Sequence, residues 1–157
     1  MNFKLIGKAN LLLSSLIVTL GISTLPASAQ QVSNAQVSAL VEALRQAAPP
    51  NSPNDGMYSQ WQILPGNIPR WSKLCIKQEL TPQQFEADTA KARSVITCIV
   101  GDTLRDEYKA SGNNELAAVR RSACWWMTGK STACTSGDTA TYVQKVVNFY
   151  QQQRKKK

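Results

Sequence analysis

Residues 81–110 read TPQQFEADTAKARSVITCIVGDTLRDEYKA, and this stretch predicts two successive helices. Thr81 is a favourable N-cap, Pro82 suits the first helical position, and Gln84 completes a capping-box pattern. A second, long helix is expected from about Thr89 to Ala110. Its apolar face carries side chains at helical spacing, namely Ile96, Ile99, Val100, Leu104 and Tyr108. Residues 81–110, together with the segments on either side, predict a mainly α fold.

Three further helices are predicted from the same kinds of signal. The first is capped by Ser33 or Asn34 and ends before Pro49, and its apolar residues recur every three or four positions. The second covers about 115–127, and Gly129 stops it in the left-handed conformation that glycine favours. The last starts near Asp138 or Thr139. Its apolar residues are Tyr142, Val143, Val146, Val147 and Tyr150.

Between these helices, residues 57–71 read MYSQWQILPGNIPRW. Three aromatic residues make the segment too apolar for a solvent loop, and its two prolines and one glycine interrupt any helical pattern. It follows the loop sequence PPNSPNDG at 49–56. We expect residues 57–71 to form an irregular or short hairpin-like pass over the core.

The N-terminus has the three parts of a secretory signal peptide. Lys4 and Lys8 precede an apolar run, and the small-residue site Ala27-Ser28-Ala29 follows it, so cleavage is predicted after Ala29. The run is too short for a membrane anchor, which needs about 20 apolar residues. Three regions are therefore predicted, namely a signal peptide at 1–29, one helical domain at 30–150 and a basic tail at 151–157. The predicted localisation is periplasmic or secreted.

The charge and the cysteine content limit which partners and which chemistry this chain can have. The chain of 157 residues carries a net charge of +8, or +6 once Lys4 and Lys8 are removed with the leader, which favours anionic envelope partners over nucleic acid in an exported protein. Four cysteines in an oxidising compartment indicate two disulfides, which sequence alone could connect in three ways. We favour Cys75–Cys98 and Cys124–Cys134, because each pair joins neighbouring elements. No C-x-x-C motif and no histidine occur, so histidine-based catalysis and the usual zinc sites are excluded, and no metal or cofactor is predicted.

Four segments in order resemble the lysozyme-like superfamily, in particular its lytic transglycosylase and phage-type cell-wall-degrading domains. They are YSQWQILPGNIPRW at 58–71, LTPQQFEAD at 80–88, NNELAAVRRSACWWMTG at 113–129 and TATYVQKVVNFY at 139–150. The resemblance covers roughly residues 35–150. It implies a small helical lysozyme-like fold in which the aromatic-Gln-Ile tract lines the floor of a sugar groove.

The resemblance also implies a catalytic residue, Glu42, on the first helix. Cleavage of a glycosidic bond needs a carboxylic acid that protonates the leaving oxygen, and transglycosylases resemble a design with one glutamate. The residues alone favour a different interpretation, a surface Glu42 paired with Arg45 at i, i+3. In addition, Ala43-Leu44-Arg45 stands where the family has a Ser-Gly-Gly turn after its glutamate.

The candidate substrate-binding residues are Tyr58, Gln62, Trp126 and Tyr142. Gln62 is suited to hydrogen-bond a sugar amide, although a buried structural glutamine would have the same pattern. In transglycosylases the tyrosine of the closing helix approaches the catalytic acid, and the resemblance gives this role to Tyr142. Its spacing also suits a core aromatic. Trp125 and Trp126 point about 100° apart on a helix, so one is expected in the core, while the other either stacks on a sugar or covers the Cys124 loop.

Two functions follow as alternatives. One is cleavage of peptidoglycan glycan strands with Glu42 as general acid/base. The other is a lysozyme-like scaffold without catalysis that serves as an envelope, glycan-binding or structural protein. In both, the expected partner is peptidoglycan or another anionic envelope glycan, with no stable membrane insertion after cleavage of the signal peptide.

Overall fold

The computed structural model describes residues 31–50, 52 and 55–156, and within them the chain is helical, with no β-strand. The mainly α prediction is confirmed, whereas the predicted signal peptide at 1–29 lies outside the described residues. The elements are α1 (Asn34–Ala47), the 3₁₀-helix η1 (Pro65–Asn67), α2 (Ile68–Ile76), α3 (Pro82–Ala87), α4 (Thr89–Ala110), α5 (Glu115–Thr128) and α6 (Gly137–Lys155).

Local capping interactions set most of the helix ends. Ser33 and Thr81 each form a complete capping box at the start of α1 and α3. The Asn114 side chain accepts from the Ala117 N–H at the start of α5, and Gly129 ends that helix with φ of 73°. These interactions span only a few residues, which explains why the sequence predicted these ends within one or two positions.

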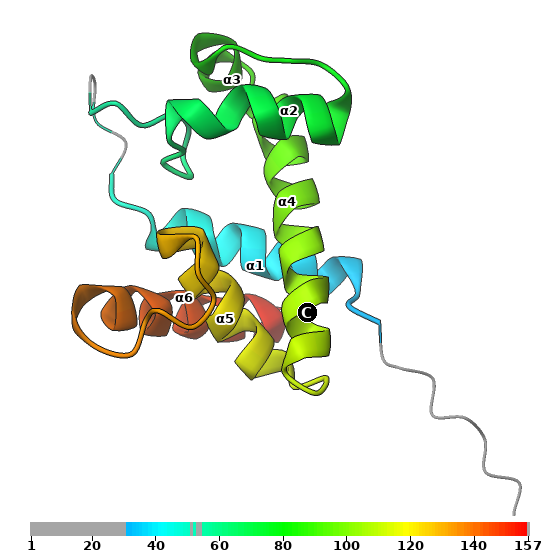
Figure 1. Cartoon of the computed structure of the whole chain (residues 1–157), viewed down its shortest axis with the longest axis vertical. Helices are drawn as coiled ribbons and strands as arrows, with labels where there is room; N and C mark the ends of the chain where they lie inside the picture. The colour runs from blue at the N-terminus through cyan, green and yellow to red at the C-terminus, as the bar shows by residue number, and fades with distance from the viewer. Residues whose placement is uncertain (1–30, 51, 53–54, 157) are drawn as a thin grey trace, which may run out of the picture.

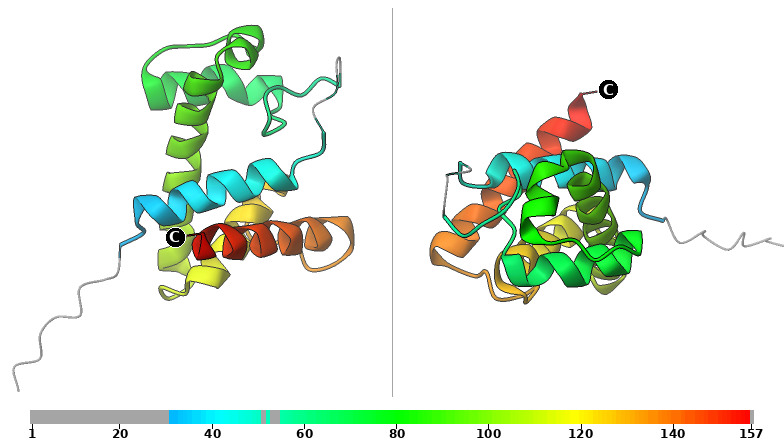
Figure 2. Two further views of the ribbon diagram at one scale, coloured as in Figure 1. Left: turned by 180° about the vertical axis from the view of Figure 1, so that it is seen from behind. Right: turned by 90° about the horizontal axis from the view of Figure 1, so that it is seen from above.

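Helix α4 connects two lobes (Figure 1). Its N-terminal end packs against α2 and α3, which with residues 57–67 form the small lobe. Its remaining turns pack against α1 and α5, which with α6 form the large lobe. Helices α1 and α6 lie side by side and run in opposite directions (Figure 2). The two lobes leave a hollow between them on one side of α4.

Helix α2 corrects the sequence prediction, which expected residues 57–71 to form an irregular or short hairpin-like pass and no helix. Pro65 begins η1 and Pro69 lies in the first turn of α2, where a missing N–H costs no hydrogen bond. The prolines therefore start helices instead of breaking one. Ser72 is buried on α2; its hydroxyl donates to the Ile68 carbonyl at 2.7 Å and accepts from the Leu80 N–H at 2.9 Å. The bond from the Leu80 N–H holds the segment just before α3 against α2.

Both predicted disulfides are present. Cys75–Cys98 joins α2 to α4, and Cys124–Cys134 joins α5 to the loop before α6. The first fastens the small lobe to the long helix, and the second closes the loop over residues 125–133. Helix α6 continues to Lys155, into the region that was predicted as a basic tail.

Candidate ligand-binding cavity

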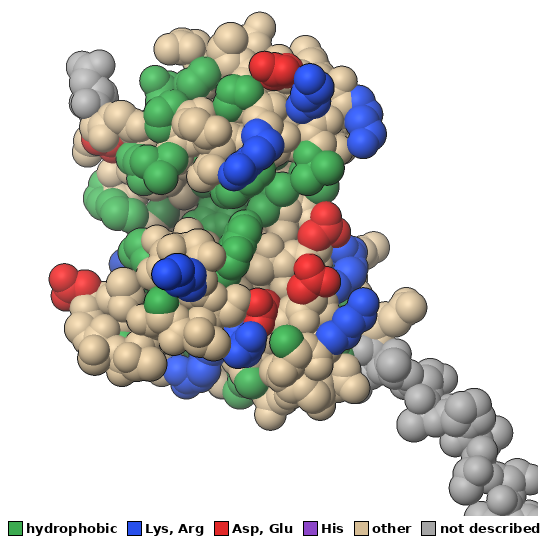
Figure 3. Space-filling model, in the orientation of Figure 1, with side chains coloured by type: hydrophobic (Ala, Val, Ile, Leu, Met, Phe, Trp, Pro, Cys, Tyr) green, Lys and Arg blue, Asp and Glu red, His purple; other side chains and the backbone are tan. Residues whose placement is uncertain are grey.

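A cavity of about 260 Å³ opens between the two lobes. Hydrophobic side chains gather around this hollow on the molecular surface (Figure 3). Four of its wall residues are aromatic, two are methionines and two carry amides. The full lining is Ala48, Pro49, Met57, Trp61, Gln62, Ile63, Leu64, Asn67, Trp71, Trp126, Met127 and Tyr142.

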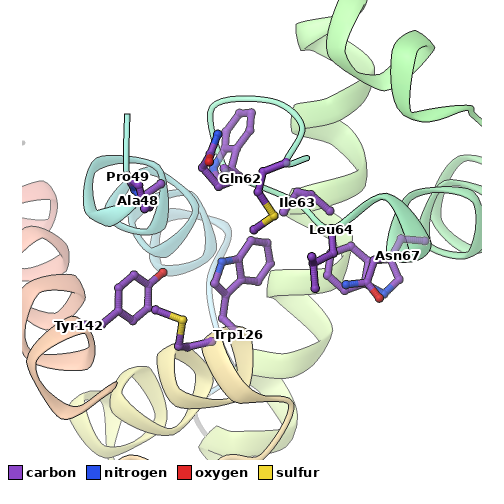
Figure 4. A pocket seen from close by; sticks show the side chains of 12 residues that line it. Ala48, Pro49, Gln62, Ile63, Leu64, Asn67, Trp126 and Tyr142 are labelled. Atoms are coloured by element: carbon purple, nitrogen blue, oxygen red, sulfur yellow. The ribbon is translucent and has the colours of Figure 1, made fainter. Parts of the chain in front are cut away.

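Aromatic rings bridge the lobes at this cavity. Trp71, on α2, lies 5.8 Å from Trp126 and 6.4 Å from Trp125 between ring centroids. Trp126 rises from α5 and Tyr142 comes from α6, and both point into the cavity (Figure 4). Trp125 does not line it. Trp125 and Trp126 are both half-buried, and Trp126 packs against the hydrophobic core as well as lining the cavity.

A tight turn carries Gln62 and Ile63 to the cavity wall. The backbones of Tyr58 and Ile63 pair in an antiparallel bridge, and Ser59 and Gln62 adopt left-handed φ values of 66° and 54°. Such values cost a non-glycine residue roughly 1–2 kcal/mol. The surrounding bonds hold the turn in place, among them one from the Ser59 N–H to the Glu86 carboxylate. The turn is thus a rigid support for the cavity wall.

Trp61 forms the inner wall. Its side chain is 1% exposed, and its indole N–H donates to the Val41 carbonyl on α1 at 2.9 Å. The Arg93 guanidinium lies 5.4 Å from the ring centroid. Trp61 therefore connects the small lobe to both α1 and α4.

The polar groups of the cavity are neutral. Burial raises the pKa of Tyr142 well above its ordinary value, so its phenol stays protonated at neutral pH. Asn67 accepts from Arg70 through Oδ1 at 3.0 Å, which leaves its amide nitrogen as a donor. Gln62 adds a second amide. The wall thus combines aromatic faces with uncharged hydrogen-bonding groups.

Glu42 lies outside this cavity. Its carboxylate accepts from Arg45 at 2.5 Å and from Gln46 at 3.0 Å, and it lies 3.5 Å from Arg93 Nη2. The hydrogen bond from Arg45 is the main cause that lowers the pKa of Glu42 to about 2. The pairing with Arg45 that the residues alone favoured is therefore present. A carboxylate held in this way is ionised at neutral pH, the opposite of what a general acid requires.

The four predicted binding residues are only partly brought together. Gln62, Trp126 and Tyr142 line one cavity, while Tyr58 lies beside it, half-buried and paired through its backbone. Sequence reasoning did not assign binding roles to Trp71, Asn67, Met57 or Met127. Asn67 and Trp71 are four residues apart, so a prediction of α2 would have placed both near one face of the same helix.

The ion pairs of Glu42 predict a pH dependence of stability. Its folded-state pKa of about 2 lies below the ordinary 4.5, so the stabilisation is complete above pH 4.5 and is lost as pH falls toward 2. The carboxylate side chain is 23% exposed. After allowance for solvent screening, we expect Glu42→Gln to lower the free energy of unfolding by about 1–2 kcal/mol at pH 7.

Urea unfolding of both proteins at pH 7 and pH 2.5 measures this effect. Most of the difference should disappear at pH 2.5. Glu79→Gln is the matched control, because Glu79 is exposed and its nearest cation, Lys73, is 3.5 Å away. A difference that is equal at the two pH values would contradict the assigned ion pairs.

No family model matches this chain, and no curated protein or solved structure matches it either. In the described part of the chain, no cluster of histidine, cysteine, aspartate and glutamate could hold a metal ion. Residues 31–50, 52 and 55–156 contain no helix that is long and apolar enough to cross a membrane.

Proposed function

We propose that this chain is an exported envelope protein with a lysozyme-like helical architecture, and that it binds a glycan in the cavity between its lobes without cleaving it. One observation carries the proposal. The cavity wall combines three tryptophans, one tyrosine and two amides, and none of its twelve lining residues is an aspartate or glutamate.

The chemistry of this wall fits a sugar ring. A pyranose has an apolar C–H face that packs on an aromatic ring, and its hydroxyl and N-acetyl groups exchange hydrogen bonds with amides and phenols. Ligand pockets usually measure about 300–1,000 Å³, so this cavity of about 260 Å³ suits a single ring. An N-acetylated hexose, the repeating sugar of peptidoglycan, is the ligand we assign.

The resemblance to lysozyme-like domains supports the same site. It implies that the aromatic-Gln-Ile tract lines a sugar groove, and Trp61, Gln62 and Ile63 all line the cavity. The leader-like residues 1–29, the two disulfides and the net charge of +8 support export and an anionic envelope partner.

Cleavage with Glu42 as general acid is the competing function. A glycosidic bond breaks when a protonated carboxylic acid reaches the leaving oxygen, and its pKa is raised for that task. Glu42 has a lowered pKa and does not line the cavity. Binding without cleavage is therefore the function that this geometry favours.

Titration of the protein with diacetylchitobiose, followed by tryptophan fluorescence and calorimetry, tests the proposal. Cellobiose is the matched ligand control because it lacks only the N-acetyl groups. Trp126→Ala should weaken binding by about tenfold or more, since a stacked ring contributes on the order of 1–2 kcal/mol. Trp125→Ala, one position away on α5 but outside the cavity, should change affinity by less than about threefold.

Two results would overturn this function. An absence of saturable binding to diacetylchitobiose would remove the glycan as ligand. Release of muropeptides from purified peptidoglycan by the wild type, and not by Glu42→Gln, would establish catalysis in place of simple binding.

A further inference from the structure

A second cavity, of about 330 Å³, lies on the large lobe. It is bounded by α5, by the loop between α5 and α6, and by the first turns of α6. Its polar lining comes from Arg120, Arg121, Ser131, Thr132, Thr135 and Gln144. It shares no lining residue with the aromatic cavity, so the two are separate sites.

The loop that forms one wall is held at several points. The Cys124–Cys134 disulfide closes it, and both cysteines line the cavity. Glu107, on α4, accepts from Arg121 Nε at 2.5 Å and also from the Ser131 hydroxyl. Arg121 and the loop are therefore fixed relative to each other before any ligand binds.

Several donors remain available at this cavity. Within the described residues, Arg120 has no ion-pair or hydrogen-bond partner, and Arg121 uses only Nε for its bond to Glu107. The hydroxyls of Thr132 and Thr135 also have no partner there.

Five carboxylates lie on α4, α5 and α6, namely Asp102, Asp106, Glu107, Glu115 and Asp138, but none of them lines the cavity. Glu107 is compensated by Arg121 and Ser131, and Asp138 lies exposed in the first turn of α6. The lining residues themselves carry two positive charges and no negative one.

We propose that this cavity binds a phosphate group through Arg120, Arg121 and the two threonine hydroxyls. Guanidinium forks bind phosphate oxygens through parallel charge-assisted hydrogen bonds, and serine and threonine hydroxyls are frequent additional donors to phosphate. These donors line one cavity from α5 and from the loop between α5 and α6, and a set of this kind suits a tetrahedral oxyanion with more than two acceptor oxygens. The group is either free phosphate or the phosphodiester of an envelope polymer.

Heteronuclear NMR on the purified protein tests the assignment. Inorganic phosphate and dimethyl phosphate are titrated separately at constant ionic strength, with chloride as the reference salt. We expect saturable shifts at the Arg120 Nε–H and at the amides of residues 130–135, and none at the Trp126 indole. Arg120→Gln should weaken phosphate binding by about tenfold, because a charge-assisted bond is lost. Lys156→Gln removes the same charge at the other end of α6 and should leave the affinity within twofold.

Saturation by both probes assigns a phosphodiester-bearing ligand, and saturation by inorganic phosphate alone assigns the free ion. Shifts that chloride reproduces, or an unchanged affinity in Arg120→Gln with a preserved spectrum, would overturn the proposal. This test is independent of the test for glycan binding. Diacetylchitobiose binding is measured at the aromatic cavity, which shares no lining residue with this one.

Discussion

Replacement of Trp61 by alanine is expected to lower the free energy of unfolding by about 4 kcal/mol, in the range of large-to-small changes in a core. The side chain is almost fully buried and packs where the small lobe meets α1 and α4. Its loss also leaves the Val41 carbonyl without its indole donor and removes the ring beneath Arg93. Because a domain of this size has a total stability of about 5–15 kcal/mol, this loss removes a large fraction of the free energy of unfolding.

Urea unfolding followed by circular dichroism measures the change without relying on tryptophan fluorescence. Trp61→Phe is the informative companion, since it keeps most of the packing and removes the hydrogen bond to Val41. A loss of about 1–3 kcal/mol is expected for that variant, from the lost hydrogen bond of the indole N–H to the Val41 carbonyl and from the smaller ring. A loss below about 1.5 kcal/mol in Trp61→Ala would contradict the central role of this ring between the lobes.

Replacement of both Cys75 and Cys98 by serine is expected to lower the free energy of unfolding by about 3 kcal/mol. The disulfide closes a loop with a sequence separation of 23 residues, so its removal increases the freedom of the unfolded chain. It is also the covalent link between α2 and α4. Trp71 lies on α2, and diacetylchitobiose binding should therefore weaken in this variant as the small lobe loosens.

The double serine variant of Cys124 and Cys134 is the matched control. Its separation of 10 residues predicts a stability loss that is roughly 0.7 kcal/mol smaller, and the link from α2 to α4 stays intact. Binding at the aromatic cavity should be affected less than in the Cys75 and Cys98 variant. Equal loss of glycan binding in the two variants would show that the small lobe does not depend on its disulfide.

The helices that sequence predicted well are those with local signals. Thr81, Pro82 and Gln84 determine the start of α3 through bonds that span three residues. The failure at α2 has a local cause as well, because Pro65 and Pro69 were interpreted as interruptions when both occupy first turns. Proline is accepted in the first turn of a helix and breaks a helix in its interior, so the two cases are distinguished by where the helix begins.

The candidate site was predictable in part. Gln62, Trp126 and Tyr142 were proposed from a resemblance, and the structure places them around one cavity although 80 residues separate the first from the last. The main partner of Glu42, Arg45 at i, i+3, was indicated by the sequence, whereas a second cation was not. Arg93 reaches it from α4, 51 residues along the chain, and together with Arg45 keeps the carboxylate ionised.

The sequence by itself determined five of the six described α-helices and most of their caps, because these follow from periodicity and from contacts between near neighbours, and it favoured the observed cysteine pairing among three possible ones. Only the tertiary structure decided which side chains line the cavities and which second arginine, Arg93, reaches Glu42 from α4. These properties arise where α2, α4, α5 and α6 approach one another, and long-range packing sets the distances between their side chains. The proposed glycan site and the proposed phosphate site therefore depend on the arrangement of the helices more than on any one segment.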